Sequence, residues 1–263
     1  NLRSGCIILF AASAYVGESV TDPAKYYRNN VGGIQSVLEA SRLTGGRPII
    51  FSSSCATYGI PDMLPIREGE TQNPINPYGR TKLIAEHMLA DYSAAYGIPY
   101  AALRYFNACG ADLDGELGEK HDPETHLIPR AMLAAAGVAD CLEVYGDDYD
   151  TPDGTCIRDY IHVVDLARAH VLSVEHLLNG GGNLVLNLGT GRGTSIKEIV
   201  DAIDRLTGRT VPVEMRARRA GDPPVLYADP AEAAAKLGFR TLYSDLDTII
   251  RTAAPFFGLE MRT

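Results

Sequence analysis

Cysteine pairs and long apolar runs are both missing from this 263-residue chain. Its five cysteines are an odd number and include no CxxC pair, which excludes a zinc knuckle and a disulfide framework, so we expect no metal site. No apolar run reaches the roughly 18 residues of a membrane-spanning helix, and the first residues lack a secretory signal. We therefore expect a soluble cytoplasmic protein with reduced thiols and no membrane partner.

Basic charge is also scarce. The chain has 24 Lys and Arg against 33 Asp and Glu, a formal net charge of -9, and its basic residues are scattered, so we expect no nucleic-acid partner. The densest basic cluster is Arg216, Arg218 and Arg219, which is either a solvated loop or a phosphate site of the kind guanidinium groups serve. A hydrophobic fraction of 46% excludes a disordered chain.

The order of apolar runs predicts a parallel sheet with helical crossovers. Short apolar runs alternate with helical patterns in the first half, as parallel strands require. We predict strands at 6–12, 48–54 and 100–106, with helices at 24–43 and 78–96 between them. Beyond about residue 110 the pattern loosens, and we predict helices near 127–137, 164–178, 195–207, 230–237 and 244–256, strands at 142–145 and 184–188, and long loops at 110–125 and 146–158.

Two short patterns point to proton chemistry. Tyr78 and Lys82 are spaced i and i+4 in a predicted helix, so their side chains share one face. An ammonium beside a phenol lowers the tyrosine pKa, which lets the tyrosine act as a general base. Ser52, Ser53 and Ser54 end a predicted strand, where open parallel sheets bind ligands. A solvated helix surface and a serine-rich turn are the alternative interpretation.

Five segments carry a family resemblance: FAASAYVGESV at 10–20, SSSCATYG at 52–59, NPYGRTK at 76–82, LRYFNACGA at 103–111 and DGTCIRDYIHV at 153–163. They resemble the UDP-glucose 4-epimerases, a branch of the extended short-chain dehydrogenase/reductase family. The last segment is specific to this branch, and the resemblance extends from about residue 7 to the last helix.

The resemblance implies an isomerase that reversibly inverts C4 of a UDP-hexose, UDP-glucose or UDP-galactose, through a 4-keto intermediate with tightly bound NAD. Tyr78 would take the proton from the sugar O4 while the nicotinamide takes the C4 hydride. Lys82 would lower the Tyr78 pKa and hold the nicotinamide ribose, and Ser54 would hydrogen-bond O4. A homodimer is implied as well, with the helices at 24–43 and 78–96 as its candidate contact.

Further positions match the family one by one. Besides Tyr78 and Lys82, the positions expected near NAD are Phe10, Ala11, Ala12, Asn30, Tyr105 and Phe106. Besides Ser54 and Tyr78, the positions expected at the UDP-sugar are Asn107 at the diphosphate, Leu127 and Tyr145 at the uracil, Arg158 and Arg219 at the diphosphate, Asp222 at the uridine ribose and Leu226 at the sugar. Leucine at position 226 leaves the choice between plain and N-acetylated sugars open. The alternatives are that Phe106 and Tyr145 are core aromatics and that Arg158 forms a structural ion pair.

The front of the chain departs from the family pattern. Family members begin with a strand, a glycine-rich turn and a helix that bind the pyrophosphate, and this chain begins inside the equivalent of the fourth strand. We reject Gly189, Gly191 and Gly193 as a substitute fingerprint, because they lie late in the chain with no second βαβ unit after them. We expect weak or absent NAD binding and an uncovered apolar edge at residues 7–10.

We therefore expect an α/β fold: a Rossmann-like doubly wound parallel sheet lacking its first strands, with a smaller α/β substrate-binding lobe. Residues 1–110 would form the partial NAD-binding domain, and 111–263 would form mainly the UDP-sugar lobe, with some segments returning to the first domain. There are two alternatives. The protein is a UDP-arabinose/UDP-xylose 4-epimerase, or it is a truncated, non-catalytic remnant.

Overall fold

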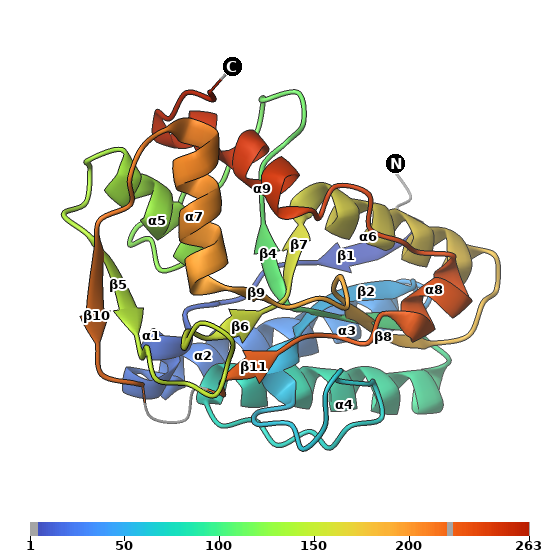
Figure 1. Ribbon diagram of the computed structural model, residues 1–263. Helices are drawn as coiled ribbons and strands as arrows, with labels where there is room; N and C mark the ends of the chain where they lie inside the picture. Colours follow the sequence, from blue (N-terminus) through green and yellow to red (C-terminus); the bar gives the residue numbers. More distant parts are fainter. Residues whose placement is uncertain (1–4, 220–222, 263) are drawn as a thin grey trace. The chain divides into compact units, whose positions relative to one another are not determined.

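The computed structural model describes residues 5–219 and 223–262 (Figure 1). The chain divides into two compact units, and each is built from three separate segments of sequence. The first unit gathers the residues up to Tyr105, Arg168–Leu188 and Asp229–Phe239. The second unit gathers Phe106–Ala167, Gly189–Ala228 and the residues from Arg240 onward.

A four-stranded parallel sheet forms the centre of the first unit. Its strand order is β1 (Ile7–Leu9), β2 (Ile49–Ser54), β3 (Tyr100–Tyr105) and β8 (Leu184–Leu188). The predicted α/β class is confirmed, and β2, β3 and β8 begin and end within a residue of their predicted bounds, because buried parallel strands are continuous apolar runs. Among the described residues β1 pairs with β2 alone, so it is the expected edge strand, with Ile8 41% exposed.

The helix predicted at 24–43 is interrupted. It consists of α2 (Pro23–Tyr26), a π-helical turn η1 (Tyr27–Val31) and α3 (Gly32–Leu43). Asp22 caps the start of α2, since its side chain accepts a hydrogen bond from the Lys25 amide, as the Asp-Pro pair predicts. A short preceding helix, α1 (Val16–Thr21), was not predicted. Single π-helical turns frequently occur at functional sites, and η1 carries Asn30.

The longest helix of the first unit is α4 (Pro77–Tyr96), which contacts both β2 and β3 and packs against α3. The Tyr92 hydroxyl donates to Glu39 at 2.6 Å and links α4 to α3. A core of nine buried residues fills the space between sheet and helices: Ile34, Leu38, Ile49, Phe51, Ala85, Leu89, Ile98, Tyr100 and Ala102. Two later helices complete the unit, the end of α6 (Val163–Leu178) and α8 (Ala231–Leu237), which contacts β8.

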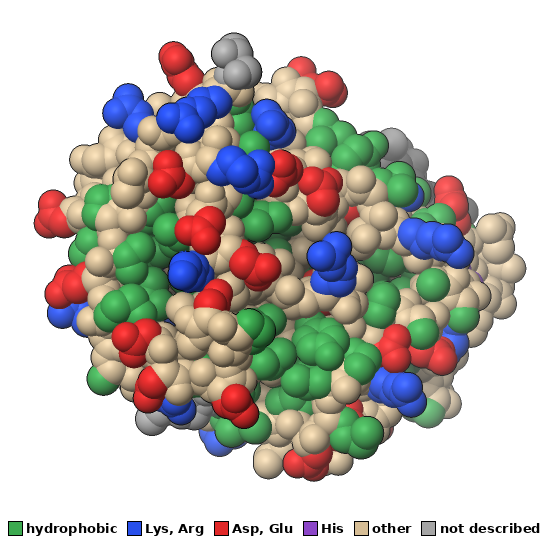
Figure 2. All heavy atoms as spheres, viewed as in Figure 1, with side chains coloured by type: hydrophobic (Ala, Val, Ile, Leu, Met, Phe, Trp, Pro, Cys, Tyr) green, Lys and Arg blue, Asp and Glu red, His purple; other side chains and the backbone are tan. Residues whose placement is uncertain are grey.

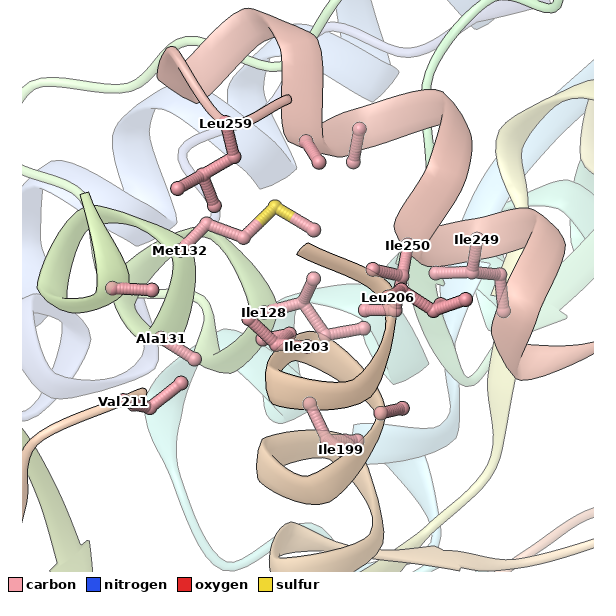
Figure 3. Close-up of a cluster of buried hydrophobic side chains, with 14 of the residues drawn as sticks. Ile128, Ala131, Met132, Ile199, Ile203, Leu206, Val211, Ile249, Ile250 and Leu259 are labelled. Atoms are coloured by element: carbon pink, nitrogen blue, oxygen red, sulfur yellow. The ribbon is translucent and has the colours of Figure 1, made fainter. Parts of the chain in front are cut away.

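The second unit has a helical core and small sheets. Helices α5 (Leu127–Ala135), α7 (Ile196–Thr207) and α9 (Leu246–Ala253), with the 3₁₀ turn η3 (Ala254–Phe257), surround apolar side chains such as Met132, Ile203 and Ile250 (Figure 3). A capping box begins α7: Ser195 accepts from the Glu198 amide while Glu198 accepts from the Ser195 amide.

Three small sheets of the second unit hold four of the nine expected substrate positions, Asn107, Tyr145, Arg158 and Leu226. The sheets are the parallel pair β4 (Asn107–Cys109) with β7 (Tyr160–His162), the parallel pair β5 (Leu142–Tyr145) with β10 (Val213–Arg216), and the set β11 (Val225–Leu226), β6 (Ile157–Arg158) and β9 (Thr194–Ser195). Of these strands only β5 was predicted. Strands of two to four residues are too short to show a periodicity.

The surface agrees with the scattered basic charge. Figure 2 shows acidic and basic side chains interspersed on the face that it presents, without a stripe of one sign on that face. In the part of the chain that the structure describes, every helix is too short or too polar to cross a bilayer.

Candidate functional site

A close approach of two elements in the first unit brings Ser54 and Tyr78 together. Ser54 ends β2 and caps the following turn, where its Oγ accepts the Ala56 amide at 3.1 Å. Asn76 caps α4 by accepting the Gly79 amide at 2.8 Å, which places Tyr78 in the first turn of the helix. A Cβ at position 79 would lie 2.4 Å from the Ala56 carbonyl oxygen, so only glycine permits this approach.

Tyr78 is a half-buried phenol with a hydroxyl neighbour. Burial raises the Tyr78 pKa to about 12, and hydrogen bonding by the Ser54 side chain lowers the pKa by less. Because Ser54 Oγ already accepts the Ala56 amide, its own hydrogen is available for donation to Tyr78. The two residues predicted to share the sugar O4 are therefore close enough for Ser54 to affect the pKa of Tyr78.

Lys82 lies one turn further along α4 and is 3% exposed. Its Nζ donates to the Ser52 carbonyl at 2.7 Å and lies 5.6 Å from the Tyr78 ring centroid. Burial lowers the Lys82 pKa to about 8, and the Glu86 charge opposes that change. In the chain by itself burial keeps the pKa of Tyr78 above its ordinary value, so the expected lowering of that pKa by Lys82 stays a prediction.

The structure contains a buried ion pair next to Lys82 that was not predicted from the sequence. Glu86 follows Lys82 by one helical turn and binds Arg104 through both carboxylate oxygens, at 3.0 and 2.6 Å. Both side chains are nearly inaccessible, and Ser53 donates to the same carboxylate. Arg104 also donates to the Tyr58 hydroxyl at 2.7 Å. Glu86 thus connects the ion pair to the environment of Lys82.

Asn30 ties the segment after β1 to α4. Its side chain accepts the Ser13 amide at 2.8 Å and donates to the Ser13 carbonyl and to Thr81 Oγ1, both at 3.0 Å. Asn30 is 7% exposed, and Thr81 lies next to Lys82 in the sequence. The connection holds the Phe10–Ala12 turn beside the helix that carries the candidate catalytic residues.

The other expected cofactor positions of the first unit lie at strand ends. Phe10 follows β1 and is 59% exposed, with its ring centroid 4.9 Å from that of His170. Tyr105 ends β3 opposite Ser54 of β2, and its hydroxyl hydrogen-bonds to His170. Burial raises the Tyr105 pKa. Polar groups from β2, β3 and α4 thus meet at the carboxyl edge of the sheet.

Asp159 organises a cluster of expected substrate residues in the second unit. This fully buried carboxylate accepts the Thr190 and Gly191 amides at 2.8 and 3.2 Å and the Ala228 amide at 3.1 Å. Its backbone carbonyl accepts both the amide and the side chain of Asn107, at 2.9 and 3.0 Å. The glycine-rich 189–193 loop therefore surrounds Asp159, a structural role that needs no dinucleotide fingerprint.

Arg158 and Leu226 are direct neighbours, because they pair in register across β6 and β11. The Arg158 guanidinium donates to the Ile157 carbonyl at 2.9 Å, and among the described residues no ion pair of Arg158 is found. Both side chains are half-buried.

The arginine cluster divides into two kinds. Arg216 and Arg218 form ion pairs, with Glu143 at 3.1 Å and with Asp148 at 2.6 Å. Arg219 instead stacks on the ring of Tyr145, with its guanidinium carbon 3.7 Å from the ring centroid. Two expected substrate positions, one in β5 and one after β10, are thereby brought into contact.

The remaining expected positions fall into three groups. Phe106, only 7% exposed, is a buried aromatic at the start of the second unit. Leu127 is the first residue of α5 and is half-buried. Asp222 lies outside the described residues.

Comparison with known proteins assigns these features to a family. A model of the NAD dependent epimerase/dehydratase family matches residues 1–189. The UDP-glucose 4-epimerase of Rhizobium leguminosarum bv. trifolii is 51% identical over 251 residues, which cover 95% of this chain and 76% of that protein.

Solved structures agree with the assignment. The UDP-glucose 4-epimerase of Brucella ovis in complex with NAD is 80% identical with a TM-score of 0.97, covering 98% of this chain and 79% of that one. A UDP-glucose 4-epimerase of Stenotrophomonas maltophila with bound NAD and formylated UDP-arabinopyranose is 39% identical with a TM-score of 0.93, covering 97% and 76%. The chain therefore belongs to the NAD-dependent epimerase/dehydratase family and, within it, to the UDP-glucose 4-epimerases.

Proposed function

We propose that the protein is an isomerase that interconverts UDP-glucose and UDP-galactose by inverting C4 of the sugar, with NAD as its redox cofactor. The observation that carries this proposal is the grouping of Ser54, whose side chain lowers the Tyr78 pKa, with the half-buried phenol of Tyr78 and with Lys82 one helical turn away. A hydroxyl pair of this kind can hold a sugar oxygen and move its proton.

The chain's own residues fit NAD at the carboxyl edge of the parallel sheet. Small side chains follow β1 at Ala11 and Ala12, and Asn30 fixes that turn. The Lys82 ammonium carries three donors, and the Ser52 carbonyl accepts one of them, which leaves donors for ribose hydroxyls. When bound, NAD would take and return the C4 hydride and would bring a positive nicotinamide ring beside the phenol.

Tyr78 and Ser54 would handle the proton at the sugar O4. A phenol with a pKa of about 12 keeps its proton at neutral pH, so a cationic neighbour is needed before Tyr78 can accept one. Lys82 supplies part of that charge, since its pKa of about 8 leaves most of the amine protonated near pH 7. Ser54, as a donor to Tyr78 Oη, favours the same ionised form.

The second unit would hold the UDP moiety. Arg158 and Arg219 would neutralise the diphosphate, because guanidinium groups match phosphate oxygens. Asn107 would hydrogen-bond the diphosphate, while Leu127 and Tyr145 would line the uracil. Stacking on Tyr145 supports this role for Arg219, since it pre-orients the guanidinium. Asp222 and Leu226 would complete the site at the uridine ribose and the sugar.

Conversion of UDP-galactose to UDP-glucose, followed by NMR with NAD present, tests the proposal. We expect Tyr78→Phe to lower turnover at least about 100-fold, because it removes the proton-transfer group and keeps the ring. Tyr96→Phe is the matched control, since Tyr96 lies on the same helix and is 55% exposed. Full activity of the Tyr78→Phe protein would overturn the assignment.

The same assay with UDP-arabinose and UDP-xylose distinguishes the pentose alternative. That alternative is favoured by the Stenotrophomonas maltophila relative, which holds a UDP-arabinopyranose derivative. If kcat/KM is higher for the UDP-pentoses than for the UDP-hexoses, the assigned substrate changes from UDP-glucose to a UDP-pentose.

We also propose that the protein acts as a homodimer in the cytoplasm. Helices α3 and α4 are the expected contact, and all five cysteines are free thiols, which fits a reducing compartment. Light scattering on a sizing column tests the first statement: a monomer at micromolar concentration would contradict it.

A further inference from the structure

Two Glu-x-His pairs lie close together in the segment between β4 and α5. They are Glu119 with His121 and Glu124 with His126. A spacing of two puts both side chains of a pair on the same side of extended backbone. One ligand atom from each of the four residues lies within 4.8 Å of all the others.

The distances within this cluster are those of a compact ligand set. Glu119 Oε1 lies 3.1 Å from His121 Nε2 and 2.9 Å from His126 Nδ1, which is also 2.9 Å from Glu124 Oε1. The two imidazole ring centroids are 4.8 Å apart. In a tetrahedral site with metal–ligand bonds of about 2.0–2.1 Å, ligand atoms lie roughly 3.3 Å from one another. Small side-chain movements would therefore convert the cluster into a coordination sphere.

The backbone around the cluster is fixed. Glu124 Oε1 accepts the Thr125 and His126 amides, each at 2.8 Å, which orients the carboxylate. A Cβ at Gly118 would lie 2.3 Å from the Phe256 ring, so the chain enters the cluster pressed against η3. Directly after the cluster, Ile128 is buried in the helical core. Anchored ends reduce the conformational entropy that ion binding would cost.

We propose that Glu119, His121, Glu124 and His126 bind a divalent transition-metal ion, with Zn²⁺ as the best match. Two imidazole nitrogens and two carboxylate oxygens suit Zn²⁺, whereas Ca²⁺ and Mg²⁺ prefer oxygen ligands alone. Four protein ligands leave no open position, which is typical of a structural site. The absence of cysteine pairs predicts no metal site, whereas the repeated Glu-x-His spacing is the sequence signal that indicates one.

The ion goes beyond the proposed reaction, since no step of the epimerisation uses it. Its effect would be on the segment that ends at Leu127, the expected uracil contact and the first residue of α5. An ion that joins residues 119 and 126 would close an otherwise long loop and fix where α5 begins.

Metal binding to the purified full chain tests the proposal directly. After chelator treatment and dialysis, we would titrate Zn²⁺ against a chromophoric competitor and record the visible spectrum with Co²⁺. We expect one high-affinity equivalent and the intense visible bands of tetrahedral Co²⁺, without the charge-transfer band of thiolate ligands. His121→Ala and the shape-preserving Glu119→Gln should each weaken Zn²⁺ binding at least about 10- to 100-fold, since even outer-shell changes cost that much.

His87→Ala is the matched control, because His87 is an exposed histidine on α4 and far along the chain from the cluster. Circular dichroism of each variant verifies that it is folded. Stoichiometric binding that His121→Ala and Glu119→Gln leave unchanged would overturn the proposal, as would an octahedral or thiolate Co²⁺ spectrum of the unmodified protein. Absence of binding at micromolar Zn²⁺ would show that the four residues form a hydrogen-bonded cluster only.

Discussion

Replacing Lys82 with methionine is expected to stabilise the fold near neutral pH while it removes activity. The ordinary pKa of the group is 10.5, and burial in the folded protein lowers it to about 8. That difference corresponds to a penalty of about 3 kcal/mol for holding the ammonium in the folded state near pH 7. Methionine has a similar length and no charge, so the penalty disappears. The lost hydrogen bond to the Ser52 carbonyl offsets about 1 kcal/mol of the gain.

The pH dependence identifies the origin of the effect. Between about pH 8 and 10.5 the unfolded chain binds a proton at Lys82 that the folded protein lacks, so the Lys82 contribution to stability rises with pH. The free energy of unfolding of the Lys82→Met protein exceeds that of the unmodified protein near pH 7, and this difference should therefore shrink by about 2 kcal/mol between about pH 7 and pH 9.5. Taking the difference between the two proteins removes the contributions of thiols and phenols, which titrate in both.

Urea denaturation at the two pH values measures this difference, and UDP-galactose conversion measures the activity. Lys236→Met is the control, because Lys236 is a half-exposed lysine of α8 and its replacement removes a positive charge that is not buried. A Lys82→Met protein that is less stable than the unmodified protein near pH 7 would refute the reasoning. So would a stability difference that does not change with pH.

Two further substitutions test the buried polar groups that support the site. Asn30→Ala removes four hydrogen bonds, two with Ser13 and one each with Thr81 and Asn29, and should lower the free energy of unfolding by about 2–3 kcal/mol, measured by denaturant titration. An unchanged midpoint would contradict its role in holding the turn. Glu86→Gln leaves the Arg104 guanidinium buried without its full counter-charge and should cost about 3 kcal/mol or more, with a further fall in the Lys82 pKa. A stability within 1 kcal/mol of the unmodified protein would show that the ion pair contributes little.

The long elements could be predicted because their patterns reflect burial directly. The apolar runs of β2, β3 and β8 have the composition of strands covered on both faces. The two-residue strands β6, β9 and β11 could not be predicted, since their pairing depends on residues far apart in sequence. The π-helical turn at 27–31 was likewise invisible in a pattern that continues at helical spacing.

The candidate site was predictable where helix geometry alone decides it. The Tyr78 and Lys82 spacing places both on one face of α4, as found. The same rule makes Lys82 and Glu86 look like a solvated surface pair, yet both are buried. Only the tertiary partner Arg104, which comes from another element, accounts for that burial. The pKa of Tyr78 likewise depends on how much of the phenol the fold covers, which the spacing of residues does not reveal.

The segmented construction of the first unit has a consequence for synthesis on the ribosome. Strand β3 pairs with β2 on one side and with β8 on the other, but about 80 residues separate the end of β3 from β8, or roughly 4 to 16 s of translation. During that interval the nascent chain presents an unpaired edge made of Tyr100–Tyr105, most of which is buried in the finished protein. Chaperones that shield strand edges should therefore engage this chain most strongly before residue 184 emerges, and slower translation of the 106–183 stretch should increase aggregation.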